Sequence, residues 1–378
     1  MFIVKVSCSK TALVSGVRTV YKAVSQKATN LVLSGILVET TADGLRLVAY
    51  DLDLGIETFI PVQVEREGSF VFPAKQFADI TGNLPHSEVI LDYSESAGSV
   101  DVISGRTHFS VKTMPAKNFP ELPELVAGKT WSMPEPELRK MIRKTAIATS
   151  TDTNRSYLMG ISVEADEEGV SMVATDSFRL AYRNVEYSTG LTGKIVSIVP
   201  ARMLREVERN LSADGTREVE ICITDRHSFV KFGNTRYITR LLEGQFPDYR
   251  KIFPENLSTR ITTDTNSFLS AIGRVSVMCK DDLSAIKMSY TGGELDSPGF
   301  LTIKVVTPEL GEAVEDLPVS LQGNAEMVVS IRAKYLKEVL QVLESDDVEI
   351  GFNSGRSPVC VKETDKEDYL YLVMPITG

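Results

Sequence analysis

Residues 35–39 read GILVE and residues 44–51 read GLRLVAYD. The same pattern returns 125 positions later, where residues 160–164 read GISVE and residues 169–176 read GVSMVATD. In each copy apolar residues recur in short alternating runs, which is typical of β-strands. Self-similarity at a fixed spacing indicates a chain built from repeated units.

Two further echoes extend the repeat. Residues 71–75 (VFPAK) return as 198–202 (IVPAR), and residues 118–121 (NFPE) return as 245–248 (QFPD), both 127 positions later. A third, degenerate copy has its first helix at 266–278 and its strand-to-helix step at 329–334 (VSIRAK). Since one third of 378 residues is 126, three units account for the whole chain. We expect domains at residues 1–126, 127–257 and 258–378.

Each unit alternates strands with two helices, which predicts an α+β fold with mostly antiparallel sheet. In the first unit Leu13, Val17 and Val24 form one helical stripe, while Arg18 and Lys22 share another face. The second unit repeats the stripe from Leu138 to Thr145. There we expect a basic face made of Arg139, Lys140, Arg143 and Lys144.

The composition predicts a soluble protein of the cytoplasm. Hydrophobic residues make up 43% of the chain, enough for a core in every domain. No apolar run is long enough to cross a membrane or to direct export. The four cysteines, Cys8, Cys222, Cys279 and Cys360, fit neither a zinc site nor a disulfide framework.

The charges are unevenly distributed. The chain has 41 basic and 51 acidic residues, a net charge of −10, so a polyanion has to meet a local basic surface. Basic residues gather on the expected helices, and between Lys5 and Val38 there is no acid at all. One interpretation is that these helices are solvated faces; the other is a surface that contacts phosphates without reading bases.

No catalytic or metal-binding motif is visible. His86, His108 and His227 lie far apart, and no glycine-rich phosphate loop is present. The pairs Asp51/Asp53 and Asp281/Asp282 are interpreted as turn residues. We therefore expect no enzyme activity, no cofactor and no metal.

Three stretches carry a resemblance to a known family. Residues 174–181 read ATDSFRLA, residues 246–254 read FPDYRKIFP and residues 371–376 read YLVMPI. In this order and at these positions they resemble the bacterial DNA polymerase III β subunits, the sliding clamps. The resemblance implies three domains of the DNA-clamp fold, each with two helices packed on antiparallel sheets. It further implies two chains joined head to tail in a ring that encircles duplex DNA and confers processivity without reading its sequence.

The resemblance also implies partners: a homodimeric second copy, duplex DNA, the polymerase III catalytic subunit, the clamp loader, and other polymerases and repair proteins that carry clamp-binding peptides. The helices would line the central hole. The residues expected to face DNA are Arg18, Lys22, Lys27, Arg139, Arg143, Arg155, Arg202, Arg205, Arg209, Arg274, Lys334 and Lys337.

A pocket for partner peptides is implied in the second and third units. It maps onto Leu158, Thr175, Ser177, Phe178, Arg179, Leu180, Pro247, Lys251, Ile252, Leu283, Pro358, Val373, Met374, Pro375 and Ile376. We expect Leu180, Pro247, Ile252 and the strand at 372–376 to form an apolar floor. Two departures affect the rim: Lys251 stands where many members have Arg, and the chain ends in Thr377-Gly378. Without the resemblance, these residues read as ordinary core and terminal-strand positions.

The implied subunit interface joins an edge strand of the first unit to the third unit. Opposite charges at the two ends would favour head-to-tail closure. A strand edge that is satisfied within one chain is the competing explanation. The interface residues are Lys75, Arg106, Phe109, Val111, Val277, Met278, Glu309, Glu312 and Glu315.

Two other functions stay open: a triplicated scaffold that binds only protein and does not encircle DNA, and an enzyme whose site converges from all three units. Neither predicts retention on circular DNA that is lost after linearisation. That measurement separates them from a clamp.

Overall fold

The computed structural model describes residues 3–25, 30–291, 299–323, 328–364 and 366–376. Every strand pair in this part of the chain is antiparallel, and six α-helices accompany the sheets, two in each repeat. The predicted α+β class and the three repeated clamp-type domains are confirmed. The chain forms two compact units, residues 1–136 with 209–241 and residues 137–208 with 242–378.

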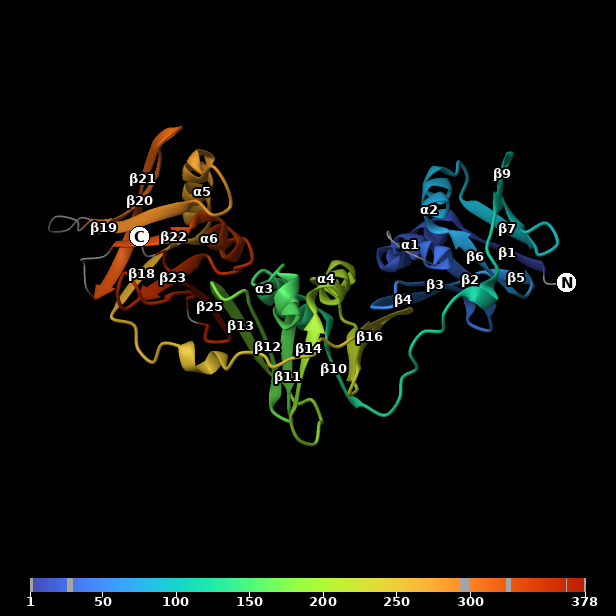
Figure 1. The fold of residues 1–378 in the computed structure, drawn as a ribbon, viewed down its shortest axis with the longest axis horizontal. Helices are drawn as coiled ribbons and strands as arrows, with labels where there is room; N and C mark the ends of the chain where they lie inside the picture. The colour runs from blue at the N-terminus through green and yellow to red at the C-terminus, as the bar shows by residue number, and fades with distance from the viewer. Residues whose placement is uncertain (1–2, 26–29, 292–298, 324–327, 365, 377–378) are drawn as a thin grey trace. The chain divides into compact units, whose positions relative to one another are not determined.

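The first unit holds two sheets (Figure 1). One has the order β5 (Gln63–Arg66), β1 (Ile3–Ser9), β7 (Glu88–Ser94), β8 (Ser99–Ser104) and β9 (Thr107–Lys112). The other runs β10 (Lys129–Pro134), β15 (Glu218–Ile223), β16 (His227–Phe232), β17 (Thr235–Arg240), β4 (Leu54–Ile60), β3 (Gly44–Tyr50), β2 (Gly35–Thr41) and β6 (Ser69–Pro73).

The second unit is built on a twelve-stranded sheet. Its order is β14 (Ile195–Pro200), β11 (Gly160–Ala165), β12 (Gly169–Thr175), β13 (Arg179–Glu186), β25 (Tyr369–Val373), β24 (Val359–Glu363), β23 (Asp347–Phe352), β18 (Thr259–Asp264), β21 (Gly311–Gly323), β20 (Gly299–Thr307), β19 (Ala285–Thr291) and β22 (Val328–Arg332).

The first helix of the chain follows the predicted stripe. Helix α1 (Lys10–Val20) begins after Ser9, whose Oγ accepts from the N–H of Ala12 at 3.1 Å. This N-cap satisfies one of the backbone donors that a helix start leaves unpaired. Leu13 and Val17 are fully buried, whereas Arg18 is exposed on the opposite face.

The predicted strand-to-helix step is present in all three repeats. Helix α2 (Ala74–Asn83) follows β6, α4 (Ala201–Asn210) follows β14, and α6 (Ala333–Leu340) follows β22. Each begins at the alanine that the repeat aligned. The first helices of repeats two and three are α3 (Glu135–Ala146) and α5 (Thr265–Val275), and in Figure 1 α1 accompanies α2 and α5 accompanies α6.

Strand pairing joins successive repeats. Strand β4 of the first repeat pairs with β17 of the second, with Thr58 opposite Thr235. Strand β13 of the second repeat pairs with β25 of the third, with Leu180 opposite Leu372. The middle repeat therefore gives one of its sheets to each compact unit, which explains why the division between the units passes through it.

The basic face expected on α3 is wrong at Lys144. This side chain is 1% exposed, and its Nζ lies 2.6 Å from Oε2 of Glu363 on β24, which is fully buried. The ammonium also lies over the ring of Tyr369 at 5.1 Å, and burial lowers its pKa from the usual value. Lys144 is buried because the third repeat packs against this side of α3, and Glu363 of that repeat supplies the opposite charge.

Replacing Lys144 with Met should lower the free energy of unfolding by about 3 kcal/mol, because the change leaves the Glu363 carboxylate buried without its main partner. Lys140→Met is the matched control on the same helix, since Lys140 is half-exposed and its ion pairs should contribute less than about 1 kcal/mol. Urea unfolding of both variants measures the difference. Equal losses would contradict the assigned role of the buried pair.

Candidate functional site

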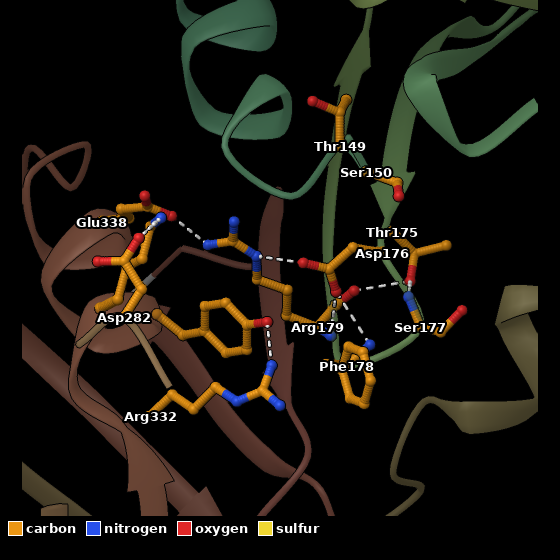
Figure 2. Close-up of polar contacts among 12 residues, drawn as sticks. Thr149, Ser150, Thr175, Asp176, Ser177, Phe178, Arg179, Asp282, Arg332 and Glu338 are labelled. Carbon is orange, nitrogen blue, oxygen red and sulfur yellow. Dashed lines mark hydrogen bonds and ion pairs between the residues drawn. The ribbon is translucent and has the colours of Figure 1, made fainter. Parts of the chain in front are cut away.

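The turn between β12 and β13 presents an exposed aromatic ring. Asp176 Oδ1 accepts from the N–H groups of Phe178 at 2.9 Å and Arg179 at 3.0 Å, and Thr175 Oγ1 donates to the carbonyl of Arg179 at 2.6 Å. Ser177 adopts a left-handed conformation with φ of 78°. Side chains rarely adopt this conformation, so the surrounding hydrogen bonds have to hold it. The turn leaves Phe178 48% exposed (Figure 2).

The C-terminal segment lies beside this turn. The N–H of Met374 donates to the carbonyl of Phe178 at 2.8 Å, and the N–H of Ile376 donates to the carbonyl of Ser330 on β22 at 2.7 Å. These two bonds fix the segment between the turn and β22. Met374 is 44% exposed and Ile376 37% exposed, so both offer apolar surface next to Phe178.

The same turn occurs in the first repeat. Leu52, which corresponds to Ser177, has φ of 81°, and these two are the non-glycine residues of the described chain with positive φ. The N–H of Arg240 donates to the carbonyl of Asp53 at 3.3 Å, as Met374 does to Phe178. In the first repeat, however, the position of Arg179 is taken by Leu54, which is buried. Asp51 accepts from the N–H groups of Asp53 and Leu54 and is thus a turn residue, as predicted.

Arg179 links this turn to the third repeat. It is only 8% exposed, and its Nε donates to Asp176 Oδ2 at 2.9 Å while Nη1 bonds the carboxylate of Glu338 on α6. Its guanidinium lies 4.2 Å from the ring centroid of Tyr335, and Tyr371 Oη is 3.4 Å from Nη1. Figure 2 shows Arg179 between Asp176 and Glu338. These contacts occupy the guanidinium, so Arg179 positions the turn.

Residues 245–254 cover one face of the β13–β25 pair. Tyr249, in the 3₁₀ turn Tyr249–Ile252, is 4% exposed and packs with Leu180, Leu372 and Cys360. Leu180 and Leu372 are 2% exposed, so they belong to the closed core under this segment. Ile252 remains 49% exposed.

Glu164 on β11 anchors this covering segment. Its carboxylate accepts from Lys194 Nζ at 2.6 Å, Tyr249 Oη at 2.9 Å and Arg250 Nη2 at 2.9 Å. Burial alone would raise the pKa of this carboxyl, but the hydrogen bonds from Arg250 and Lys194 outweigh burial and lower the pKa to about 2. The charged carboxylate thus holds the segment that carries Pro247, Lys251 and Ile252.

The structure brings the predicted pocket residues together within the second unit but divides them by exposure. The exposed ones are Ser177, Phe178, Pro247, Lys251, Ile252, Leu283, Met374 and Ile376. Pro358 and Pro375 are half-buried. Five are buried: Leu158, Thr175, Arg179, Leu180 and Val373. The predicted floor is corrected at Leu180 and Leu372, which Tyr249 covers. We call the exposed set, together with the two prolines, the partner cleft.

Sequence reasoning missed two residues at this cleft. Arg332 ends β22, and its Cζ lies 4.6 Å from the ring centroid of Phe178. Tyr335, on the first turn of α6, accepts a hydrogen bond from Arg332 Nη1 through its Oη, and its ring packs against the guanidinium of Arg179. The sequence does distinguish this position: Pro73 and Pro200 precede the second helix in the first two repeats, whereas Arg332 precedes it in the third.

Some of the residues expected to face DNA contact acidic or carbonyl groups of the same chain. Arg139 lies 3.4 Å from Glu208, Arg205 donates to the carbonyl of Ala146 at 2.8 Å, and Lys334 lies 2.5 Å from Asp282. Arg155 lies beside the cleft, where its Nη1 donates to Ser177 Oγ at 2.8 Å. Arg274 makes three hydrogen bonds to Glu315. The remaining exposed side chains are Arg18, Lys22, Arg143, Arg202, Arg209 and Lys337, and Lys27 lies outside the described residues.

Strand β9 forms the open end of the first sheet. Phe109 and Val111 lie opposite Val102 and Val100, which are fully buried, so their side chains continue the core face of the sheet. Phe109 is 37% exposed because no further strand covers it in the described part of the chain. Arg106 is exposed in the preceding turn, and Lys75 is exposed on α2.

The acids expected at the opposite end do not form one patch. Glu309 lies 2.7 Å from Lys280, Glu312 lies 2.7 Å from Lys304, and Glu315 pairs with Arg274. These local ion pairs reduce the acidic charge that this end can offer to a partner. Apolar surface is present instead: Val277 is 77% exposed and Val314, on β21, is 51% exposed. Met278 is half-buried.

In the described ranges, no group of three or more His, Cys, Asp or Glu side chains is placed to hold a metal ion. Likewise, no helix among these residues has both the length and the apolar character needed to cross a membrane. The cysteines are unpaired, and burial raises the pKa of Cys8 to about 11 and that of Cys360 to about 12.

Comparison with known proteins gives consistent matches over the whole chain. Three models for the DNA polymerase III beta subunit match: the N-terminal domain at residues 4–123, the central domain at 132–248 and the C-terminal domain at 250–377. The beta sliding clamp of Synechococcus elongatus is 30% identical, covering 98% of this chain and 99% of its own. That of Bacillus subtilis is 29% identical with the same coverage.

Solved structures match equally well. The DNA polymerase sliding clamp of Bacillus subtilis superposes with a TM-score of 0.91 at 28% identity, covering 99% of both chains. A sliding clamp of Pseudomonas aeruginosa bound to griselimycin gives a TM-score of 0.90 at 26% identity, covering 99% of this chain and 100% of that one.

The Glu164 anchor makes stability depend on pH. Because the folded-state pKa is lowered, the stabilisation is complete above the ordinary value of about 4.5 and is lost as the pH falls toward 2. Between pH 5 and pH 3 the wild-type protein should lose about 2 kcal/mol more unfolding free energy than Glu164→Gln, which keeps no titrating group there. Urea unfolding at both pH values measures this.

Glu167→Gln is the matched control, because Glu167 is an exposed carboxylate three residues away. Between pH 5 and pH 3 the Glu167→Gln variant should lose as much unfolding free energy as the wild type. A wild type and a Glu164→Gln variant with the same pH dependence would contradict the anchor.

Proposed function

Because the chain belongs to the family of bacterial DNA polymerase III beta subunits, the β sliding clamps, we propose that it closes into a ring around duplex DNA and carries the replicative polymerase along it. The protein is a processivity factor and not an enzyme. It binds DNA without reading its sequence, and the tether is topological: a closed ring slides freely but dissociates only after opening.

The observation that carries the DNA part of this proposal is the placement of exposed basic side chains on helices of all three repeats. Arg18 on α1, Arg143 on α3, Arg202 on α4 and Lys337 on α6 are exposed in a chain of net charge −10. Positive helices attract phosphates of any sequence, while an acidic remainder disfavours binding elsewhere. We propose that these helices face the DNA, and that the repeats span residues 1–126, 127–257 and 258–378.

Ring closure needs a second copy, and two strand edges fit it. Strand β9 has one open edge, and residues 311–319 of β21 pair with β20 alone among the described strands. Pairing β9 of one protomer with this half of β21 of its partner would satisfy both edges and cover Phe109 and Val314. Because the nearby acids are paired locally, we attribute closure to backbone pairing and apolar contact more than to opposite charges.

Retention on DNA circles tests the topological proposal. Loaded with a clamp loader, the protein should remain on nicked circular DNA and be released when the circle is cut, and its mass in solution should be twice 41.6 kDa. Phe109→Asp should give monomers that are not retained, because the new charge would be buried without a partner. Leu31→Asp, at a side chain that is 71% exposed, should behave as wild type.

Equal retention on linear and circular DNA would contradict encirclement and leave a protein-binding scaffold as the better explanation. A dimer formed by Phe109→Asp would contradict the assigned edge.

We further propose that the partner cleft receives short peptides from partner proteins in the bacterial cytoplasm. The candidate partners are the polymerase III catalytic subunit, the clamp loader, and other polymerases and repair proteins. Phe178, Ile252, Leu283, Met374 and Ile376 supply exposed apolar side chains within one unit, next to the fixed turn. Such a surface suits an extended peptide with apolar anchors.

Replacing Met374 and Ile376 with Ser should weaken a labelled peptide from the polymerase C-terminus about 30-fold. The lost apolar contact corresponds to roughly 2 kcal/mol, while the backbone bonds to Phe178 and Ser330 remain. Fluorescence anisotropy gives the affinity, and solution mass shows whether the ring stays dimeric. Val196→Ser is the matched control, since Val196 is 55% exposed on β14 at the far end of the sheet order. Unchanged affinity in the double variant would refute the cleft.

A further inference from the structure

Arg332 is held in a defined orientation at the partner cleft. Its Cζ lies 4.6 Å from the ring centroid of Phe178 and 5.3 Å from that of Tyr335, and its Nη1 donates to Tyr335 Oη at 2.6 Å. Figure 2 shows the Arg332 side chain extending toward the ring of Phe178. Two aromatic contacts and a hydrogen bond therefore restrict the rotamers of a residue that is only half-buried.

Several other basic side chains around the cleft have an acidic partner. Arg179 lies 2.9 Å from Asp176 and also contacts Glu338, and Lys334 lies 2.5 Å from Asp282. The same holds on the remaining sides of the cleft, with Arg155 paired to Asp152 at 3.0 Å and Lys251 paired to Asp248 at 2.7 Å.

Arg332 differs from them. Within the described ranges no carboxylate oxygen lies within 4.0 Å of its guanidinium, because Glu338 and Asp282, on the neighbouring elements, are engaged by Arg179 and Lys334. The guanidinium has five N–H donors, and the contacts above use one. The rest are presented next to the exposed ring of Phe178.

We propose that Arg332 is a specificity determinant of the partner cleft and pairs with the side-chain carboxylate of an Asp or Glu in the bound peptide. A guanidinium fixed against rings is pre-organised for a bidentate bond to a carboxylate. The acidic residue would lie beside the apolar anchor that contacts Phe178. This inference rests on the proposed binding of peptides in the cleft.

The test uses the full-length protein and a positional peptide series. The probe is the labelled peptide from the polymerase C-terminus, made without charged side chains and with an amidated end, followed by versions with one Asp at each position in turn. Affinities are measured for wild type, Arg332→Gln, Arg332→Lys and the control Lys287→Gln, which removes an exposed cation from β19, the strand that pairs with β22.

At one position Asp should raise the affinity of wild type and Lys287→Gln about 3- to 10-fold. Arg332→Gln should lose this gain while binding the uncharged peptide as well as wild type does. Arg332→Lys should keep part of the gain, because it retains the charge but not the planar fork.

Four results would overturn the inference: no gain at any position, a gain that persists in Arg332→Gln, an equal loss for the uncharged peptide, or a gain obtained only with a free terminal carboxylate. An Arg332→Gln defect in duplex DNA binding alone would overturn it in favour of a phosphate contact. Failure of the uncharged peptide to bind wild type would refute the cleft itself, and the Met374/Ile376 variant identifies that case separately.

Discussion

Antiparallel pairing of strands from successive repeats is the interaction on which the other features depend. The β4–β17 pair joins the first repeat to the second, and the β13–β25 pair joins the second to the third. Each pairing brings a turn of one repeat next to the residues that follow the paired strand of the next repeat. At the first junction the turn at Asp53 meets Arg240, and at the second the turn at Phe178 meets Met374. The backbone bond from Met374 to Phe178, and its counterpart from Arg240 to Asp53, follow directly from this register. The proposed contact with a second copy uses two edges that this pairing leaves open, that of β9 and that of the first half of β21.

The two junctions have the same turn and strand pairing but bury different side chains. Where the first has Leu54, the second has Arg179, which binds Asp176 and Glu338 from two repeats. The Lys144–Glu363 pair and the Glu164 anchor add two more polar links within the same unit. Buried charges are stabilising only when every partner is present, so they specify one arrangement of the turn, the covering segment and the tail. The partner cleft forms at the junction that has these links.

Internal ion pairing also changes the meaning of the charge pattern. Basic residues recur on the helices, yet Arg139, Arg274 and Lys334 each contact an acid of the same unit. Their charges contribute less to the outward field than a count of lysines and arginines suggests. Among the remaining basic residues, those exposed on α1, α3, α4 and α6 carry the proposed attraction for phosphate. At the cleft, Arg332 has no carboxylate within 4.0 Å among the described residues, and we propose that a bound partner supplies one.

The sequence by itself determined the triplication, the antiparallel α+β class and the start of each second helix, because these depend on local periodicity and on spacings that repeat along the chain. Through the family resemblance it also predicted the residues of the proposed partner cleft. Tertiary structure alone decided which of them are accessible: Leu180 and Leu372 are covered by Tyr249, a residue that lies dozens of positions away from either. It likewise decided that Lys144 is buried and that Arg332 lacks an acidic partner. Such outcomes depend on which distant side chains pack around a group, and a linear pattern of charges and apolar residues does not encode those neighbours.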